Sequence, residues 1–111
     1  AAGSRMHREQ PALHFLYTQI SDLNPARSLA ELGALLRAAG AVTPDAVATL
    51  DLPVLFIVGT EDIVIPPLVL ERAAAHFKNA RVELIPAAGH SVYFERPAVF
   101  NAIVERFLME E

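Results

Sequence analysis

Two ionisable side chains follow two apolar segments of this chain, and together they could carry out acid–base chemistry. Asp62 comes shortly after the run Pro53-Val-Leu-Phe-Ile-Val-Gly59, and His90 follows the segment Arg81-Val-Glu-Leu-Ile85. The two lie 28 positions apart, about one strand–helix unit, so parallel strands would bring both to one edge of a sheet. A carboxylate there can fix the imidazole tautomer and stabilise the imidazolium during proton transfer. The spacing therefore predicts an acid–histidine pair.

Each of these residues also has a purely structural interpretation. Asp62 could close an Asx turn or cap the helix that begins near Pro66, and His90 could bond only to backbone. Their pairing at one predicted edge favours chemistry over both alternatives. The sequence contains no cysteine and no H-x-x-x-H or H-E-x-x-H spacing, so we expect no metal and no cofactor.

The pattern after residue 51 predicts alternating strands and helices. Val54–Val58 is apolar on both faces, as in a central parallel strand, and Arg81–Ile85 forms a second, more alternating strand. A helix begins at Pro66–Pro67, and a final one covers Pro97–Met109. The first of these helices carries its apolar residues at helical spacing, at Leu70, Ala73, Ala74 and Phe77. This order implies a parallel strand pair with a right-handed crossover, and two strands alone make an incomplete sheet.

In the first half of the chain, the sequence pattern predicts only helices. One covers Pro11–Leu23, with Tyr17 on its apolar face. A second runs from Leu29 to Ala39 and ends at Gly40, because Ser28 and Glu31 have the capping-box pattern. Thr43-Pro-Asp45 could begin one more short turn.

Two motifs carry a family resemblance. The segments Pro53-Val-Leu-Phe-Ile-Val-Gly-Thr-Glu-Asp-Ile-Val-Ile-Pro66 and Ala88-Gly-His-Ser-Val-Tyr-Phe-Glu-Arg-Pro97 resemble the last two core strands, and their loops, of the α/β-hydrolase family. The resemblance covers residues 51–111 and implies an α/β fold: the C-terminal portion of a parallel sheet.

The resemblance also implies roles for individual residues and segments. Asp62 matches the triad acid and His90 the general base, while Glu95 braces the histidine loop. Residues 1–50 are similar to the helical cap segment of the family, and Ala1-Ala-Gly3 could be the tail of an earlier strand.

The departure from the family is the missing nucleophile. Its members carry a G-x-S-x-G elbow, and this pattern does not occur here. Ser4 lacks a preceding strand, and Ser91 adjoins His90 too closely to reach the reactive imidazole nitrogen. We therefore expect a C-terminal fragment whose partner is the missing N-terminal part of the hydrolase, and which is inactive alone.

The expected function is hydrolysis of a carboxylic ester or a small acyl substrate. Apolar residues after the acid and after the histidine suggest an apolar substrate pocket, although they could simply seal the sheet: Val64, Ile65, Val92 and Tyr93. Haloalkane dehalogenase, epoxide hydrolase, haloperoxidase-like and carbon–carbon bond hydrolase relatives remain alternatives. So does a non-catalytic protein that uses the scaffold for ligand binding or as an interaction module.

The composition of the chain limits the kinds of partner that we expect it to bind. The net charge is −4 with scattered basic residues, which argues against nucleic acid, and no apolar run is long enough to span a membrane. The mean hydropathy of +0.34 is high for a short domain and suggests a surface that another polypeptide covers, whether that is the missing part or a second copy. The default compartment is the cytoplasm.

Overall fold

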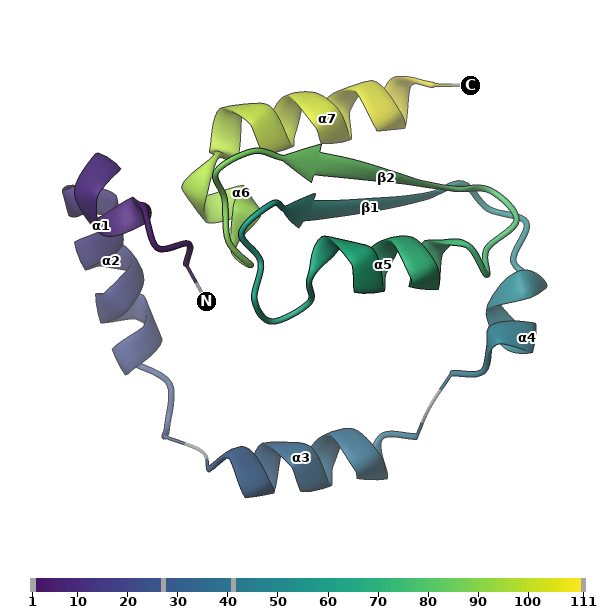
Figure 1. The fold of residues 1–111 in the computed structure, drawn as a ribbon, viewed down its shortest axis with the longest axis horizontal. Coiled ribbons are helices and arrows are strands. Elements are labelled where there is room, and N and C mark those ends of the chain that lie inside the picture. The colour runs from purple at the N-terminus through teal and green to yellow at the C-terminus, as the bar shows by residue number, and fades with distance from the viewer. Residues whose placement is uncertain (1, 27, 41, 111) are drawn as a thin grey trace.

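A computed structural model describes residues 2–26, 28–40 and 42–110 of the chain. Its elements are four helices, a strand–helix–strand unit and two closing helices (Figure 1). In chain order they are α1 Met6–Glu9, α2 Pro11–Asp22, α3 Leu29–Ala38, α4 Pro44–Ala48, β1 Val54–Gly59, α5 Pro67–Ala74, β2 Ala80–Ile85, α6 Val92–Glu95 and α7 Pro97–Met109.

The strands β1 and β2 form a parallel pair, with Val54 opposite Ala80 and Gly59 opposite Ile85. The helix α5 covers one face of this pair and α7 the other (Figure 1). This three-layer arrangement confirms the predicted α/β class, and it brings the two loops that leave the carboxyl ends of β1 and β2 to the same edge.

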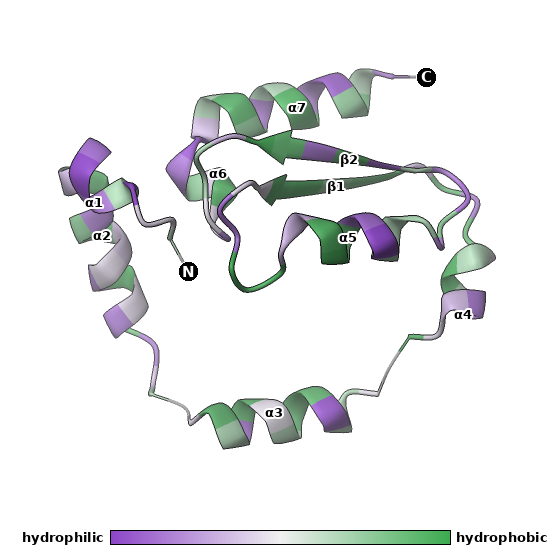
Figure 2. Ribbon diagram, in the orientation of Figure 1, coloured by the Kyte–Doolittle hydropathy of each residue, from purple (hydrophilic) through white to green (hydrophobic). Residues whose placement is uncertain are grey.

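The core lies between the sheet and α7. It consists of apolar side chains from β2, from the loop after β2, from α6 and from α7: Ile85, Ala88, Val92 and Ile103. Three partly buried side chains pack against this cluster: Leu55, Ile57 and Phe100. Figure 2 shows mainly apolar residues along β1, and a mixture of apolar and polar residues on β2 and α7. Burial of such apolar surface is the main force that holds the strands against α7.

The N-terminal helices form an arc, which runs from α1 and α2 beside α6 through α3 to α4 (Figure 1). The capping box predicted for α3 is present, because the Ser28 side chain accepts from the Glu31 N–H and the Glu31 side chain accepts from the Ser28 N–H. Thr43 likewise caps α4 by accepting from the Ala46 N–H. The leucines of α3 nevertheless lack a covering surface: Leu29, Leu32, Leu35 and Leu36 are 45 to 88% exposed.

Several details differ from the sequence prediction. The helix α5 ends at Ala74, before Phe77, because a tight turn in which Phe77 N–H donates to Ala74 C=O leads the chain back to β2. The one-turn helices α1 and α6 are too short to leave a periodic pattern. Ala2 and Gly3 are not in a strand, and Ala1 lies outside the described residues.

Within the described ranges, no helix has the length and apolar character needed to cross a membrane.

Candidate active site

The structure brings Asp62 and His90 into direct contact. Nδ1 of His90 lies 2.8 Å from Oδ2 of Asp62. The Asp62 side chain is 4% exposed and the His90 side chain 40%, so the carboxylate is sealed in the protein while the imidazole reaches the surface. This is the geometry in which a buried acid orients a histidine that is open to a reacting partner.

The second oxygen of Asp62 is bound within its own loop. Oδ1 accepts from Val64 N–H at 2.8 Å and from Ile65 N–H at 3.0 Å. This is an Asx-type turn, so the structural interpretation of Asp62 holds alongside its contact with His90. The two oxygens serve different partners, and the carboxylate plane is fixed from both sides.

These contacts decide the charge of Asp62. Burial acts to raise the pKa of this carboxyl, but the hydrogen bonds from Ile65 N–H, the His90 ring and Val64 N–H outweigh burial. The pKa of Asp62 therefore lies below its ordinary value, and the group is a carboxylate near neutral pH. An ionised carboxylate only accepts hydrogen bonds, so Nδ1 of His90 is the donor.

The other ring nitrogen of His90, Nε2, is then unprotonated in the neutral ring. It has no hydrogen bond to any residue in the described part of the chain. A free Nε2 on an oriented imidazole can take a proton from a hydroxyl or a water and later return it, which is general acid–base catalysis.

The loop that carries His90 approaches the end of β1 very closely. A Cβ at Gly59 would overlap the carbonyl oxygen of Ala88, so only glycine allows this approach. Ala87 has a φ of 53°, an uncommon conformation for a residue other than glycine. Its N–H donates to Thr60 Oγ1 and its carbonyl accepts from Arg96, so both of its polar groups are held.

Glu95 is buried beneath the same loop, with only 2% of its surface exposed. Its Oε1 accepts from Gly89 N–H at 3.0 Å and from Gly3 N–H at 2.8 Å. This placement fits the bracing role that the family resemblance implies, and it also ties the beginning of the described chain to the histidine loop.

Tyr17 is a contact that the sequence interpretation missed. Its hydroxyl oxygen lies 3.0 Å from Oγ of Ser91, the residue after His90, and its ring packs edge-on against Phe94. A partly buried tyrosine hydroxyl normally needs a polar partner, so the tyrosine on the apolar face of this helix already indicated that such a partner exists. The sequence could not say which of the distant polar residues would be that partner.

The apolar residues expected to form a pocket divide into two groups. Ile65 lines a hollow of about 190 Å³ beside Asp62 and His90, together with residues of β1 and with Leu70. Val64, Val92 and Tyr93 are not part of that lining, and a role for them in binding substrate stays a prediction. Val92 is 5% exposed because it belongs to the core under α7, and the Tyr93 ring packs against Phe100.

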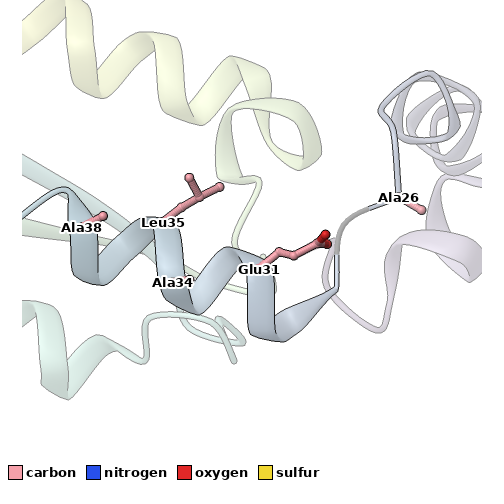
Figure 3. A pocket seen from close by; sticks show the side chains of 5 residues that line it. All are labelled: Ala26, Glu31, Ala34, Leu35 and Ala38. Atoms are coloured by element: carbon pink, nitrogen blue, oxygen red, sulfur yellow. The ribbon is translucent and has the colours of Figure 1, made fainter.

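Other hollows occur among the described residues. One of about 400 Å³ borders Asp62 on the side of Gly3, Ser4 and Glu61. A larger one, of about 530 Å³, lies along α3 and shares no residue with the Asp62–His90 pair (Figure 3). Its lining is mostly alanine with Leu35 and Glu31, so it offers shape and apolar surface but little chemistry.

No cluster of three or more potential metal ligands occurs among the residues that the structure describes.

Comparison with known proteins gives a consistent pattern. A family described as "alpha/beta hydrolase fold" matches residues 5–97 of the chain. Among solved structures, a proposed non-haem bromoperoxidase from Mycobacterium tuberculosis, BpoC, is 27% identical with a TM-score of 0.72, over 96% of this chain. No curated protein matches the chain significantly.

Two esterases are also similar over part of the chain. A thermophilic esterase from Thermogutta terrifontis is 29% identical over 59% of this chain with a TM-score of 0.57. The naproxen esterase of Bacillus subtilis is 29% identical over 60% of it with a TM-score of 0.56. The match covers 24% of each esterase and 40% of BpoC, so the chain corresponds to less than half of any of the three.

Proposed function

The chain belongs to the α/β-hydrolase fold family, and from this premise we propose that it supplies the acid and the histidine of a serine-type hydrolase. The observation that carries the proposal is the 2.8 Å contact between buried Asp62 and partly exposed His90. A non-catalytic binding protein has no need for an ionised carboxylate sealed behind an accessible imidazole, so this contact favours catalysis.

In the proposed reaction His90 moves the protons. Nε2 accepts the proton of the attacking serine hydroxyl as its oxygen bonds to the ester carbonyl carbon, and then gives that proton to the departing alkoxide. A water molecule repeats the cycle, losing its proton to Nε2 and releasing the acid, after which the serine oxygen regains the proton. Asp62 stabilises the imidazolium at each stage without taking up the proton itself.

The serine belongs, in this proposal, to a segment outside the 111 residues. The sequence has no G-x-S-x-G elbow, and the chain matches only part of each similar structure. Residues 51–111 would be the end of the hydrolase core, and residues 1–50 a cap-like helical segment above it. The exposed leucines of α3 support this division, because a cap needs an apolar side toward the substrate or the core.

We propose a carboxylic ester or a related small acyl compound as the substrate. Two of the similar structures are esterases, and the hollow beside His90 is lined mainly by apolar side chains. An apolar lining favours the hydrocarbon part of such a substrate and leaves its carbonyl as the polar group.

The proposal is tested by substitution in the active polypeptide that contains these residues. Asp62→Asn is expected to lower kcat for a p-nitrophenyl ester by about 10⁴-fold, because the amide favours the wrong imidazole tautomer. His90→Ala is expected to be comparably damaging. Asp51→Asn and His76→Ala are matched controls at exposed positions and should retain activity. Unchanged turnover in Asp62→Asn would refute the assignment.

BpoC favours one second candidate, because it matches 96% of the chain. That candidate is bromide oxidation by hydrogen peroxide with the same pair of residues. A bromination assay run beside the ester assay separates the two candidates. The reaction is identified by the assay in which the wild type is active and His90→Ala is inactive.

A further inference from the structure

The residue next to His90 is held by a helix from the opposite end of the chain. Ser91 is 5% exposed, and its Oγ is 3.0 Å from the hydroxyl oxygen of Tyr17, which lies in α2. The Tyr17 ring meets the Phe94 ring edge-on, with 5.3 Å between centroids. The hydroxyl and the ring therefore dock α2 on the segment that begins with His90.

Two neighbouring contacts strengthen this attachment. The Gln10 side chain donates to the Glu95 carbonyl at 3.2 Å, and Glu9 pairs with Arg96 at 2.8 Å. Both reach α6 or its end, at some distance along the chain from His90. Among the hydrogen bonds described for α1 and α2, only that of the Tyr17 hydroxyl reaches Ser91, the residue that follows His90.

We propose that Tyr17 is a positioning residue for His90, acting through Ser91. The hydrogen bond fixes the Ser91 side chain and its backbone, and this limits the directions in which the adjacent imidazole can face Asp62. The orientation of the base therefore depends on where α2 sits, so the helix and the acid–base pair form one unit. This inference rests on the proposed function, since it concerns the same histidine.

The test measures which nitrogen of the neutral His90 ring carries the proton, from nuclear magnetic resonance spectra of the ¹⁵N-labelled 111-residue chain. We expect the wild-type ring to be protonated mainly at Nδ1, toward Asp62. Tyr17→Phe and Ser91→Ala should each lower the ratio of Nδ1–H to Nε2–H about two- to tenfold, the effect of losing one net hydrogen bond. The double variant should lose no more than either single variant, because both remove the same bond.

The matched control is Tyr93→Phe, which removes the hydroxyl of an exposed tyrosine that also packs on a phenylalanine. It should leave the ratio unchanged. Tyr17→Phe keeps the ring on Phe94, so we expect it to fold; if it does not, Ser91→Ala alone decides the outcome.

The proposal is overturned if Tyr17→Phe behaves like Tyr93→Phe, or if the effects of Tyr17→Phe and Ser91→Ala simply add. A wild-type ring with no preference for Nδ1–H would instead contradict the Asp62–His90 pairing, and with it both the proposed function and this inference. A wild-type preference for Nδ1–H whose ratio is unchanged in Tyr17→Phe overturns only the inference.

Discussion

The carboxylate of Asp62 shows how one residue can satisfy a structural and a chemical demand together. One oxygen closes the turn through Val64 and Ile65, and the other receives the His90 ring. If only the turn mattered, asparagine would serve almost as well, since its side-chain oxygen can also close an Asx turn. The difference between the two side chains therefore falls on the histidine contact and on charge.

The low pKa of Asp62 predicts a pH-dependent stability. Because hydrogen bonds hold this pKa below its ordinary value in the folded chain, the stabilisation is complete above the unfolded value and is lost as the pH falls through the folded one. We expect the free energy of unfolding of the wild-type chain to decrease over that acidic range, and to decrease less in Asp62→Asn. Urea unfolding at a series of pH values measures this.

The control for this prediction is Asp51→Asn, at an exposed position, which should keep the wild-type pH dependence. Parallel loss of stability in the wild type and in Asp62→Asn would contradict the assignment of the effect to this carboxylate.

Residues of the site differed in how far the sequence could predict them. Asp62 and His90 were predictable, because a fixed spacing and a parallel topology are enough to place two loops together. The contact of Tyr17 with Ser91 was not, since it joins positions 74 residues apart and depends on how α2 docks. The place of Val92 in the core depends on a single helical turn, α6, which is too short to leave a periodic pattern in the sequence.

Elements were predicted best where a pattern repeats. Helix α7 has the predicted bounds, Pro97–Met109, because its apolar stripe covers several turns. Helix α3 begins where its capping box places it, after Ser28. The early end of α5 at Ala74 depends on the return path to β2, which no local signal in the sequence specifies.

Replacing glycine by alanine is expected to have opposite effects on stability at the end of β1 and inside α3. Gly59→Ala should lower the free energy of unfolding by about 1–3 kcal/mol, because the new methyl group meets the Ala88 carbonyl. Gly33→Ala should instead favour α3 by about 0.5–1 kcal/mol, because Gly33 lies inside a helix and a methyl there meets only the flexible Arg37 side chain.

Urea unfolding measures the first effect and far-ultraviolet circular dichroism the second. If Gly59→Ala were as stable as the wild type, contact with the Ala88 carbonyl would not be what excludes a side chain at this position. If Gly33→Ala lowered the helix content, the prediction for α3 would be wrong.

The molecule as a whole combines a packed part with an open one. The unit from β1 to α7 contains the described apolar core, whereas the leucines of α3 are exposed. The high mean hydropathy already indicated uncovered surface, but the sequence could not say that α3 would hold so much of it.

This division predicts uneven hydrogen exchange. Amides of β1, β2 and α7 should exchange at least about a hundredfold more slowly than those of α3, because opening the core requires global unfolding whereas α3 can open alone. Exchange followed by nuclear magnetic resonance measures the rates residue by residue. Equal protection of α3 and β2 would mean that the leucines are covered in solution.

The turn from Asp62 to Ile65 has a consequence for assembly. The two hydrogen bonds that Asp62 Oδ1 accepts, from Val64 N–H and Ile65 N–H, are local, so four consecutive residues are enough to orient the carboxylate. His90 then contacts a carboxylate whose orientation is already fixed, so the contact requires little further ordering of the Asp62 side chain. We therefore expect that the same four residues, placed after another parallel strand, would hold the aspartate carboxylate in the same orientation.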